Sequence, residues 1–166
     1  MDIKEKTSIQ SLKARGKAIP MDDDQRHLWQ EEFNALPAMI ALGSKLDISD
    51  ETIIKVVLPE ILPHHLGGLG SAYVNGAVVA GLLDASLGVA GAVHYLGQPA
   101  GTVELSIKFM RAIHGPTVTA YAVALKRSES VCFVEGKLFS EGRLCALASG
   151  LVALASSAEG ADELRW

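Results

Sequence analysis

The run Gly76–Val93, GAVVAGLLDASLGVAGAV, constrains the fold of this chain more than any other segment. Apart from Asp84 and Ser86, it consists of glycine, alanine, valine and leucine. Because apolar residues stand on both sides of the aspartate, the run predicts a helix that is buried around most of its circumference. A buried carboxylate is costly unless it is paired, hydrogen-bonded or protonated. Asp84 is therefore either a catalytic group or a residue that fixes the packing through its own hydrogen bonds.

The chain has the length and composition of one globular domain, with 166 residues of which 49% are hydrophobic and 20% are charged. We expect a flexible basic arm over residues 1–20, a folded domain over 21–155 and a polar, acidic tail over 156–166. A net charge of −4, without a dense Lys/Arg cluster in the folded part, argues against nucleic-acid binding.

Two further features predict where the protein is found. The N-terminal segment has no apolar core of the kind found in secretory signals. The long apolar run contains an aspartate and four glycines, which argues for a buried helix and against a membrane span. We therefore expect a cytoplasmic protein without a membrane partner.

The pattern of the remaining chain predicts an α+β fold. Acidic residues 22–24 precede a helix that we expect to end at Pro37, and the β-branched segment Thr52–Leu58 predicts a strand. After the apolar run, four segments predict strands joined by short connections, as in an antiparallel meander. These segments are Thr102–Met110, Thr117–Leu125, Val131–Phe139 and Arg143–Leu154.

The two cysteines, Cys132 and Cys145, flank a tight turn expected at Glu141-Gly142. In a hairpin with that turn they lie about 20 Å apart, beyond the reach of a disulfide. We expect free thiols in the sheet.

Asp84 shares a helix face with small residues, since Ala80, Gly88 and Gly91 recur at helical spacing from it. A ligand or another backbone can approach closely on such a face. Tight packing of the helix on a sheet explains the glycines equally well, but it does not explain why the carboxylate stands among them.

Asn75 is a suitable N-cap for the predicted helix, and the free N–H groups from Gly76 onward form an electropositive end suited to a developing oxyanion. Gly76 and Asp84 lie about 12 Å apart along the helix axis, too far to act on the same bond within one chain. Two such helices packed antiparallel about a two-fold axis would bring Gly76 of one chain beside Asp84 of the other.

The stretch Val74–Val93, followed by GTVELSIKFMRAI, resembles the hotdog-fold acyl-CoA thioesterases of the phenylacetyl-CoA-pathway and 4-hydroxybenzoyl-CoA thioesterase type. That family has a His-Gly-Gly at the helix start, an acid nine residues after the histidine, and a later strand of the type Thr-x-(Asp/Glu)-Leu that ends in Arg-Pro. Here Asn75-Gly76-Ala77, Asp84 and the segment from Thr102 to Arg111 occupy these places, and the resemblance covers roughly residues 25–154.

Three positions depart from the family pattern. Asn75 replaces the usual histidine, and Ala112 replaces the proline after Arg111. A polar residue expected several positions before the His-Gly-Gly falls at Leu69. The departures leave the fold expectation unchanged, and they bear on catalysis and on the substrate.

The resemblance implies a hotdog-fold homodimer or homotetramer that hydrolyses an acyl-CoA thioester. It assigns Asp84 as general base or nucleophile, the Gly76 amide of the partner chain as oxyanion donor, and Thr102 as the residue that helps to hold the water. It implies no metal and no cofactor, because CoA is part of the substrate. Two alternatives remain, a non-catalytic acyl-CoA-binding module and a hotdog-fold hydratase or dehydratase that acts on acyl thioesters.

Three residues are candidates for substrate binding. Asn75 stands at the helix start, and Arg111 is expected to meet the CoA phosphates. His65 is expected to be exposed in the loop before the helix, either as an ordinary loop residue or at the lip of the substrate entrance. His64 and His65 would need a third ligand to bind a metal, and no histidine with suitable spacing is present. The low aromatic content, 5%, fits an aliphatic tunnel somewhat better than an aromatic pocket.

Overall fold

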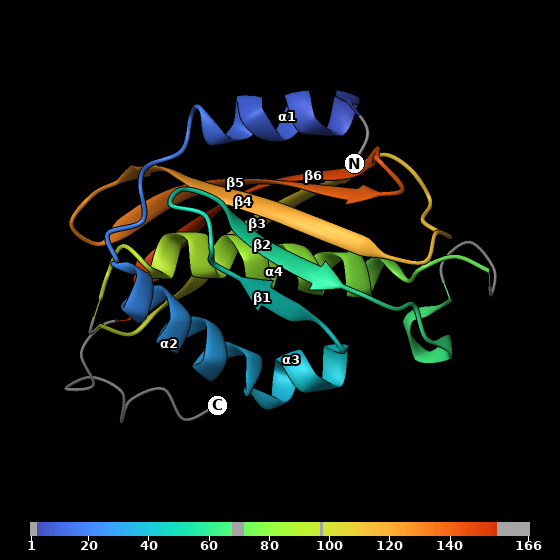
Figure 1. The fold of residues 1–166 in the computed structure, drawn as a ribbon, viewed down its shortest axis with the longest axis horizontal. Helices are drawn as coiled ribbons and strands as arrows, with labels where there is room; N and C mark the ends of the chain where they lie inside the picture. Colours follow the sequence, from blue (N-terminus) through green and yellow to red (C-terminus); the bar gives the residue numbers. More distant parts are fainter. Residues whose placement is uncertain (1–2, 68–71, 97, 156–166) are drawn as a thin grey trace.

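The long apolar run forms the helix α4 (Gly76–Ala92), which lies against one face of a six-stranded antiparallel sheet (Figure 1). The computed structural model describes residues 3–67, 72–96 and 98–155. Leu82, Leu83 and Leu87 of α4 have no exposed surface and form the centre of the core with the sheet. The expected α+β arrangement, one apolar helix against an antiparallel sheet, is confirmed.

The sheet has the strand order β1-β2-β4-β5-β6-β3, and each pairing is antiparallel. The four long strands lie where the sequence pattern predicts them, within two residues at each end. The short first strand was not expected. The strands are β1 (Lys45–Asp47), β2 (Ile54–Leu58), β3 (Ala100–Phe109), β4 (Val118–Arg127), β5 (Val131–Ser140) and β6 (Arg143–Leu154).

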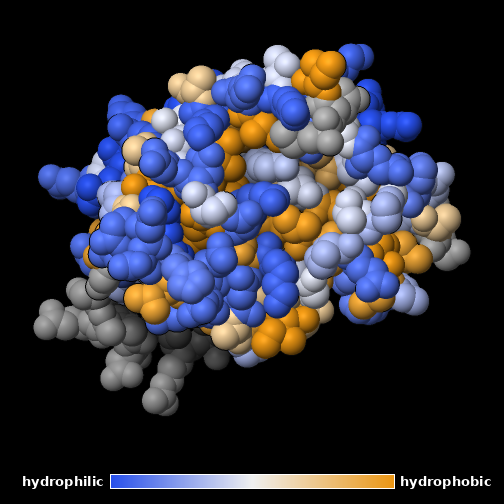
Figure 2. Space-filling model, viewed as in Figure 1, coloured by the Kyte–Doolittle hydropathy of each residue, from blue (hydrophilic) through white to orange (hydrophobic). Residues whose placement is uncertain are grey.

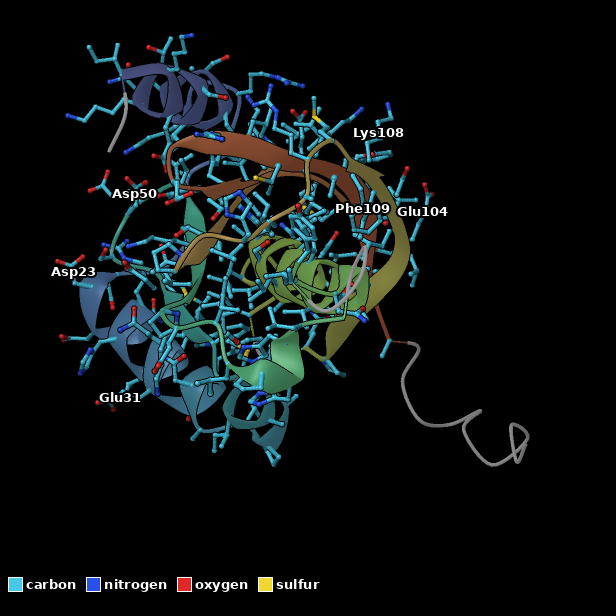
Figure 3. All side chains as sticks on the ribbon, turned by 90° about the vertical axis from the view of Figure 1, so that its right-hand side faces the viewer. Asp23, Glu31, Asp50, Glu104, Lys108 and Phe109 are labelled. Atoms are coloured by element: carbon cyan, nitrogen blue, oxygen red, sulfur yellow. The ribbon has the colours of Figure 1, made fainter. Side chains whose placement is uncertain are left out.

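The strand β3 lies at the edge of the sheet beside β6, so the expectation of one four-strand meander is wrong. Only β4, β5 and β6 form a meander, because the loop 110–117 is long enough to carry the chain across the end of the sheet. Figure 3 shows Phe109 of β3 on the side of α4, whereas Glu104 and Lys108 point away from the helix. The free edge of β3 has no partner strand among the described residues.

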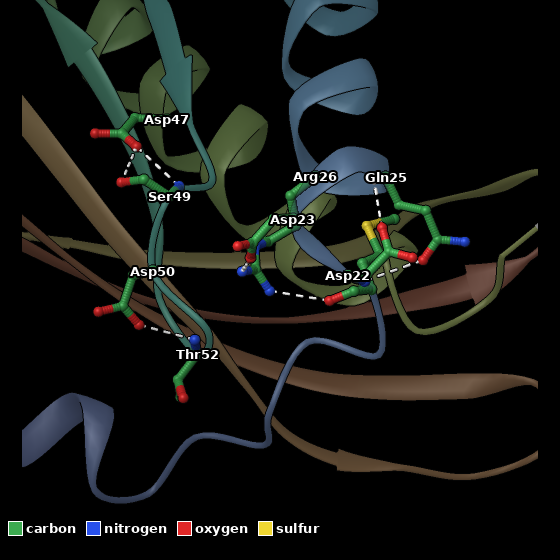
Figure 4. A network of polar contacts seen from close by, with 9 residues as sticks. Asp22, Asp23, Gln25, Arg26, Asp47, Ser49, Asp50 and Thr52 are labelled. Carbon is green, nitrogen blue, oxygen red and sulfur yellow. Dashed lines mark hydrogen bonds and ion pairs between the residues drawn. The ribbon is translucent and has the colours of Figure 1, made fainter.

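Two shorter helices, α2 (Asp23–Asn34) and α3 (Pro37–Leu42), lie below α4 in Figure 1. The capping box of α2 is complete, since Asp22 accepts a hydrogen bond from Gln25 N–H at 2.8 Å and the Gln25 side chain accepts one from Asp22 N–H at 3.1 Å (Figure 4). Pro37 opens α3 and does not merely end the preceding helix, as the first helical position tolerates its missing N–H. Some hydrophobic residues are exposed at the surface along this lower edge of the molecule (Figure 2).

The structure also corrects the expectation of a flexible arm over residues 1–20. Residues Ile3–Lys13 form the helix α1, which covers the sheet face opposite α4 (Figure 1). Leu12 is fully buried there in a second hydrophobic cluster with Tyr121 and Phe139. An ion pair of 2.5 Å between Lys13 and Asp50 ties the end of α1 to the loop before β2 (Ile54–Leu58). α1 is thus part of the folded structure.

This packing predicts that Leu12→Ala lowers the free energy of unfolding by about 2–5 kcal/mol, because it leaves a cavity in the second cluster. Chemical denaturation measures the change. Ile3→Ala in the same helix is the matched control, since Ile3 is 81% exposed and its truncation should have little effect. Equal stability of the two variants would mean that α1 does not pack on the sheet.

Cys132 and Cys145 are both free, as expected, and both are buried. Burial raises the pKa of Cys132 to about 11, so this thiol stays protonated at neutral pH. The expected tail over residues 156–166 lies outside the described residues.

Candidate functional site

Asn75 caps α4, as its residue type predicts. Its backbone is extended, with φ −64° and ψ 139°, and its Oδ1 accepts a hydrogen bond from Ala77 N–H at 2.8 Å. The Asn75 carbonyl oxygen accepts the first helical bond, from Val78 N–H at 3.0 Å. The exposed Gly76 has no acceptor for its own N–H among the described residues. This N–H is therefore available to a ligand at the positive end of the helix dipole.

His65 is buried, with 1% of its surface exposed, so the expectation that it forms the lip of an entrance is wrong for the single chain. It ends the short 3₁₀ turn η1 (Pro63–His65), and its ring lies beside Gly43 at the end of α3. Its carbonyl oxygen accepts a hydrogen bond from Asn75 N–H at 2.8 Å. The punctuated loop suggested exposure, but η1 folds inward and supports the start of α4.

A pocket of about 330 Å³ opens beside Gly76. Arg111 is exposed at this pocket, and it forms no ion pair with a described residue. The N–H groups of Met110 and Arg111 both donate to the Cys145 carbonyl oxygen, at 2.8 and 3.1 Å, and so hold the chain after β3 against β6. The walls include the mainly apolar side chains of Tyr73, Val79, Phe109, Met110 and Ile113.

The sequence pattern did not single out Phe109, Tyr73 or Cys145 as pocket residues. Phe109 lies 3.6 Å from the position that a Cβ on Gly76 would take, so its ring forms the wall opposite the helix start. The sequence signal that could have identified Phe109 as a pocket residue is its position two residues before Arg111. Burial raises the pKa of Cys145, and the thiol is therefore a lining group at neutral pH and not a ready nucleophile.

Asp84 is exposed in the single chain, which corrects the expectation of a buried carboxylate. It lies on the face of α4 between α3 and the edge strand β3, where Ala77 is also exposed and Gly81 and Gly88 are half-buried, beside Leu42 and Thr102 respectively. Gly91 is not part of this face. It is buried against Val152 of β6, so closely that a Cβ would not fit. The face around Asp84 is formed by small residues, as the spacing predicts.

Thr102 of β3 lies one helical turn from Asp84 along this face. Its Oγ1 is 3.2 Å from the position that a Cβ on Gly88 would take, and Gly88 follows Asp84 by four residues. The glycine thus lets the threonine hydroxyl approach the helix backbone. A bulge in the β3–β6 register directly after Thr102 marks the same place in the sheet.

The candidate residues therefore form two groups within one chain. Gly76, Asn75 and Arg111 gather at the pocket by the start of α4, whereas Asp84 and Thr102 lie farther along the helix. The rise of an α-helix separates Gly76 from Asp84 by about 12 Å. A single chain does not bring the free amide and the carboxylate to one reacting bond.

Within the described residues, no three His, Cys, Asp or Glu side chains gather closely enough to hold a metal ion. No helix in the described part of the chain is long and apolar enough to span a membrane.

Residues 72–146, from the loop before α4 to the start of β6, match the family model of the thioesterase superfamily. The resemblance to hotdog-fold thioesterases is thereby confirmed, and the sheet and helix have the hotdog arrangement. Similarity to this superfamily supports thioester hydrolysis as the general class of reaction and a small thioester as the substrate. No curated protein sequence matches the chain.

Solved structures share this fold. A protein from Shewanella oneidensis related to the thioesterase superfamily has a TM-score of 0.70 at 19% identity, with 82% of this chain and 99% of that chain covered. A thioesterase from Haemophilus influenzae has a TM-score of 0.72 at 14% identity, with coverages of 86% and 97%. The E. coli PaaI protein from the phenylacetic acid degradation operon has a TM-score of 0.67 at 18% identity, with coverages of 88% and 97%. At these identities the similarity concerns the fold.

Proposed function

We propose that the protein hydrolyses an acyl-CoA thioester to a free acid and CoA, at a site formed by two chains. The superfamily match supports the class of reaction. The observation that carries the proposed site is the geometry of α4, with an unpaired amide at Gly76 beside a pocket and an exposed carboxylate at Asp84 on a face of small residues.

In the proposed reaction the thioester carbonyl oxygen accepts a hydrogen bond from the Gly76 N–H, at the positive end of the helix. Asp84 of the other chain takes a proton from a water molecule that Thr102 holds, and the water oxygen bonds to the carbonyl carbon. The carbon–sulfur bond then breaks, the CoA thiolate leaves and takes up the proton, and the acid is released. Direct attack by the Asp84 carboxylate, followed by hydrolysis of the anhydride, is the second form of this mechanism.

The surface of the single chain supports the pairing of two copies. The edge strand β3 and the residue after it expose three large apolar side chains, namely Val103 (65% exposed) and Phe109 (60%) in the strand and Met110 (51%) directly after it. An unpaired strand edge with exposed apolar groups is a surface for association. In our proposal two β3 edges meet about a two-fold axis, so that the two α4 helices run antiparallel and Gly76 of each chain faces Asp84 of the other.

The proposed substrate fits the groups at the pocket. Arg111 is the cation for the CoA phosphates, since its guanidinium is exposed and without an ion pair among the described residues. The apolar walls around Phe109 receive the uncharged part of the substrate next to the thioester. Water is the only co-reactant that this reaction needs.

A panel of acyl-CoAs incubated with the protein and a thiol reagent tests the proposal. We expect release of free CoA from at least one aliphatic acyl-CoA. Loss or gain of water on an enoyl chain would instead indicate a hydratase or dehydratase, and saturable binding without turnover would indicate a binding module. Either of these results would overturn the proposed hydrolysis.

Substitution of Asn75 separates its capping role from its place beside the proposed oxyanion. Asn75→Ser and Asn75→Asp keep a capping oxygen, so we expect their stability to stay within about 1 kcal/mol of the wild type, whereas Asn75→Ala should lose about that much. Asn75→Asp also places a negative charge beside the Gly76 N–H, and we expect a folded protein with strongly reduced kcat/KM. Thermal unfolding and acyl-CoA hydrolysis measure the two effects, and a fully active Asn75→Asp protein would argue against an oxyanion at this helix end.

A further inference from the structure

The buried ring of His65 takes part in a chain of hydrogen bonds that ends in the first turn of α4. The Leu62 N–H donates to His65 Nδ1 at 3.0 Å. The His65 carbonyl oxygen accepts from Asn75 N–H at 2.8 Å, and the Asn75 side chain in turn accepts from Ala77 N–H at 2.8 Å. The ring therefore fixes η1, and η1 fixes the residue that caps the helix.

The hydrogen bond from the Leu62 N–H defines which nitrogen of the His65 ring carries the proton. Because Nδ1 accepts this bond, it carries no proton, and the neutral ring has its proton on Nε2. Nε2 is buried without a hydrogen-bond partner among the described residues. The Leu42 carbonyl oxygen at the end of α3 is near enough to favour the protonated ring, but it does not reach hydrogen-bond geometry with Nε2.

Protonation of His65 is incompatible with this arrangement. A charged ring has a proton on both nitrogens, so the Nδ1–H and the Leu62 N–H would then face each other as two donors. The ring would also carry a buried positive charge, with only the Leu42 carbonyl oxygen, outside hydrogen-bond geometry, near Nε2–H. The folded turn must open to accommodate the charge, and the support of Asn75 opens with it.

We propose that His65 is a positioning residue for the start of α4, and that its protonation in mild acid releases this turn and switches the site off. The effect on catalysis rests on the proposed function, whereas the effect on the helix start does not. The outcome is an acid limit on activity set by a group outside the reacting pocket.

The surroundings of His65 lower its pKa on balance, so they favour the neutral ring. Burial lowers the pKa of His65, and the neighbouring His64, whose ring centroid lies 4.0 Å away, lowers it further, while the Leu42 carbonyl partly offsets both. Gly43, at the end of α3, lies beside the ring and carries no charge. Since the unfolded chain takes up a proton near pH 6.5 and the folded chain only at lower pH, stability is complete above about 6.5 and is lost as the pH falls.

The test compares His65→Asn with wild type and with His64→Asn as the matched control. Asparagine can offer Oδ1 to the Leu62 N–H in place of Nδ1, and it never takes up a proton. Hydrogen exchange of the Ala77 amide reports the helix start without reference to catalysis, and NMR of the labelled His65 ring reports its protonation. The pH profile of kcat/KM for the best acyl-CoA adds the functional readout.

We expect the protection factor of the Ala77 amide in the wild type, which is corrected for the intrinsic exchange rate at each pH, to fall at least tenfold as the His65 ring takes up its proton, and kcat/KM to fall with it. His64→Asn should show the same loss of protection at a somewhat higher pH, because His64 lowers the pKa of His65, and His65→Asn should keep Ala77 protected at the wild-type pH. Burial also lowers the pKa of His94, so this residue too contributes to the loss of stability in acid. The free energy of unfolding at low pH is therefore compared only as the difference between variants.

Wild-type Ala77 protection that does not change while His65 titrates, or loss of protection in His65→Asn at the wild-type pH, would overturn the proposal. A protein without acyl-CoA hydrolysis but with this Ala77 behaviour would refute the proposed function alone. If His65→Asn does not fold, the wild-type titration decides.

Discussion

Asp84→Asn is expected to leave the fold unchanged and to lower kcat for acyl-CoA hydrolysis by about 10²- to 10⁴-fold, the usual contribution of a general base. The side chain is exposed in the single chain and forms no hydrogen bond with another described residue, so folding of the protomer does not depend on its charge. The amide has nearly the same shape but cannot take a proton from water or attack a carbonyl carbon. Circular dichroism and steady-state release of CoA measure the two outcomes.

Glu129→Gln is the matched control for this variant. It makes the same change from carboxylate to amide at an exposed position in the connection between β4 and β5, outside the proposed site. We expect wild-type turnover from it. An Asp84→Asn protein that turns over as fast as this control would show that the carboxylate has no catalytic role.

The second large effect concerns the proposed oxyanion donor. Gly76→Pro removes the Gly76 N–H itself, and we expect kcat/KM to fall by about 10²- to 10³-fold, as after loss of one oxyanion donor. The fold should tolerate the change. Gly76 is the first residue of α4, a position where proline is favoured, and Asn75 already has the extended backbone that the residue before proline requires.

Gly76→Ala is the control that keeps the N–H and adds only a methyl group. Its Cβ would lie in ordinary contact with the Phe109 ring, at 3.6 Å, so the protein should fold normally. We expect a much smaller loss of kcat/KM than in Gly76→Pro. Equal losses would assign the effect to crowding in the pocket, and an active Gly76→Pro protein would remove the amide from the mechanism.

The central helix and the long strands could be predicted from the sequence because their patterns are local. Alternation of apolar and polar residues over Thr102–Met110 reports one covered sheet face, and the apolar run reports a helix in the core. The helix α1 could not be predicted in this way. Its polar composition gives little periodicity, and it is held by contacts of Leu12 with strands far along the chain.

The edge position of β3 and the exposure of Asp84 also depend on the whole fold. Strand order is not encoded in the alternation of a single strand, and short connections favour neighbouring strands only as a tendency. Hydropathy counts alanine and glycine as apolar although they cost little when exposed. The predicted burial of α4 around most of its circumference, Asp84 included, therefore overlooked the open face around Ala77 and Gly81.

The candidate site was predictable to a similar extent. The cap at Asn75 and the free amide at Gly76 follow from residue type and position, and the structure has these features. The pocket beside Arg111 was not predicted. Their catalytic roles remain proposals. The inward position of His65 depends on packing against α3, which the loop sequence does not specify.

The central claim is that each site takes Gly76 from one chain and Asp84 from the other. Subunit exchange between the Gly76→Pro and Asp84→Asn proteins tests it most directly. Each variant alone has two damaged sites, but a mixed dimer has one site with both native residues and one site with neither. After complete exchange at equal amounts, half of the dimers are mixed, and we predict that activity returns to about one quarter of the wild-type value. A mixture that stays as inactive as its two components, although mass spectrometry shows the mixed dimers, would contradict the two-chain site.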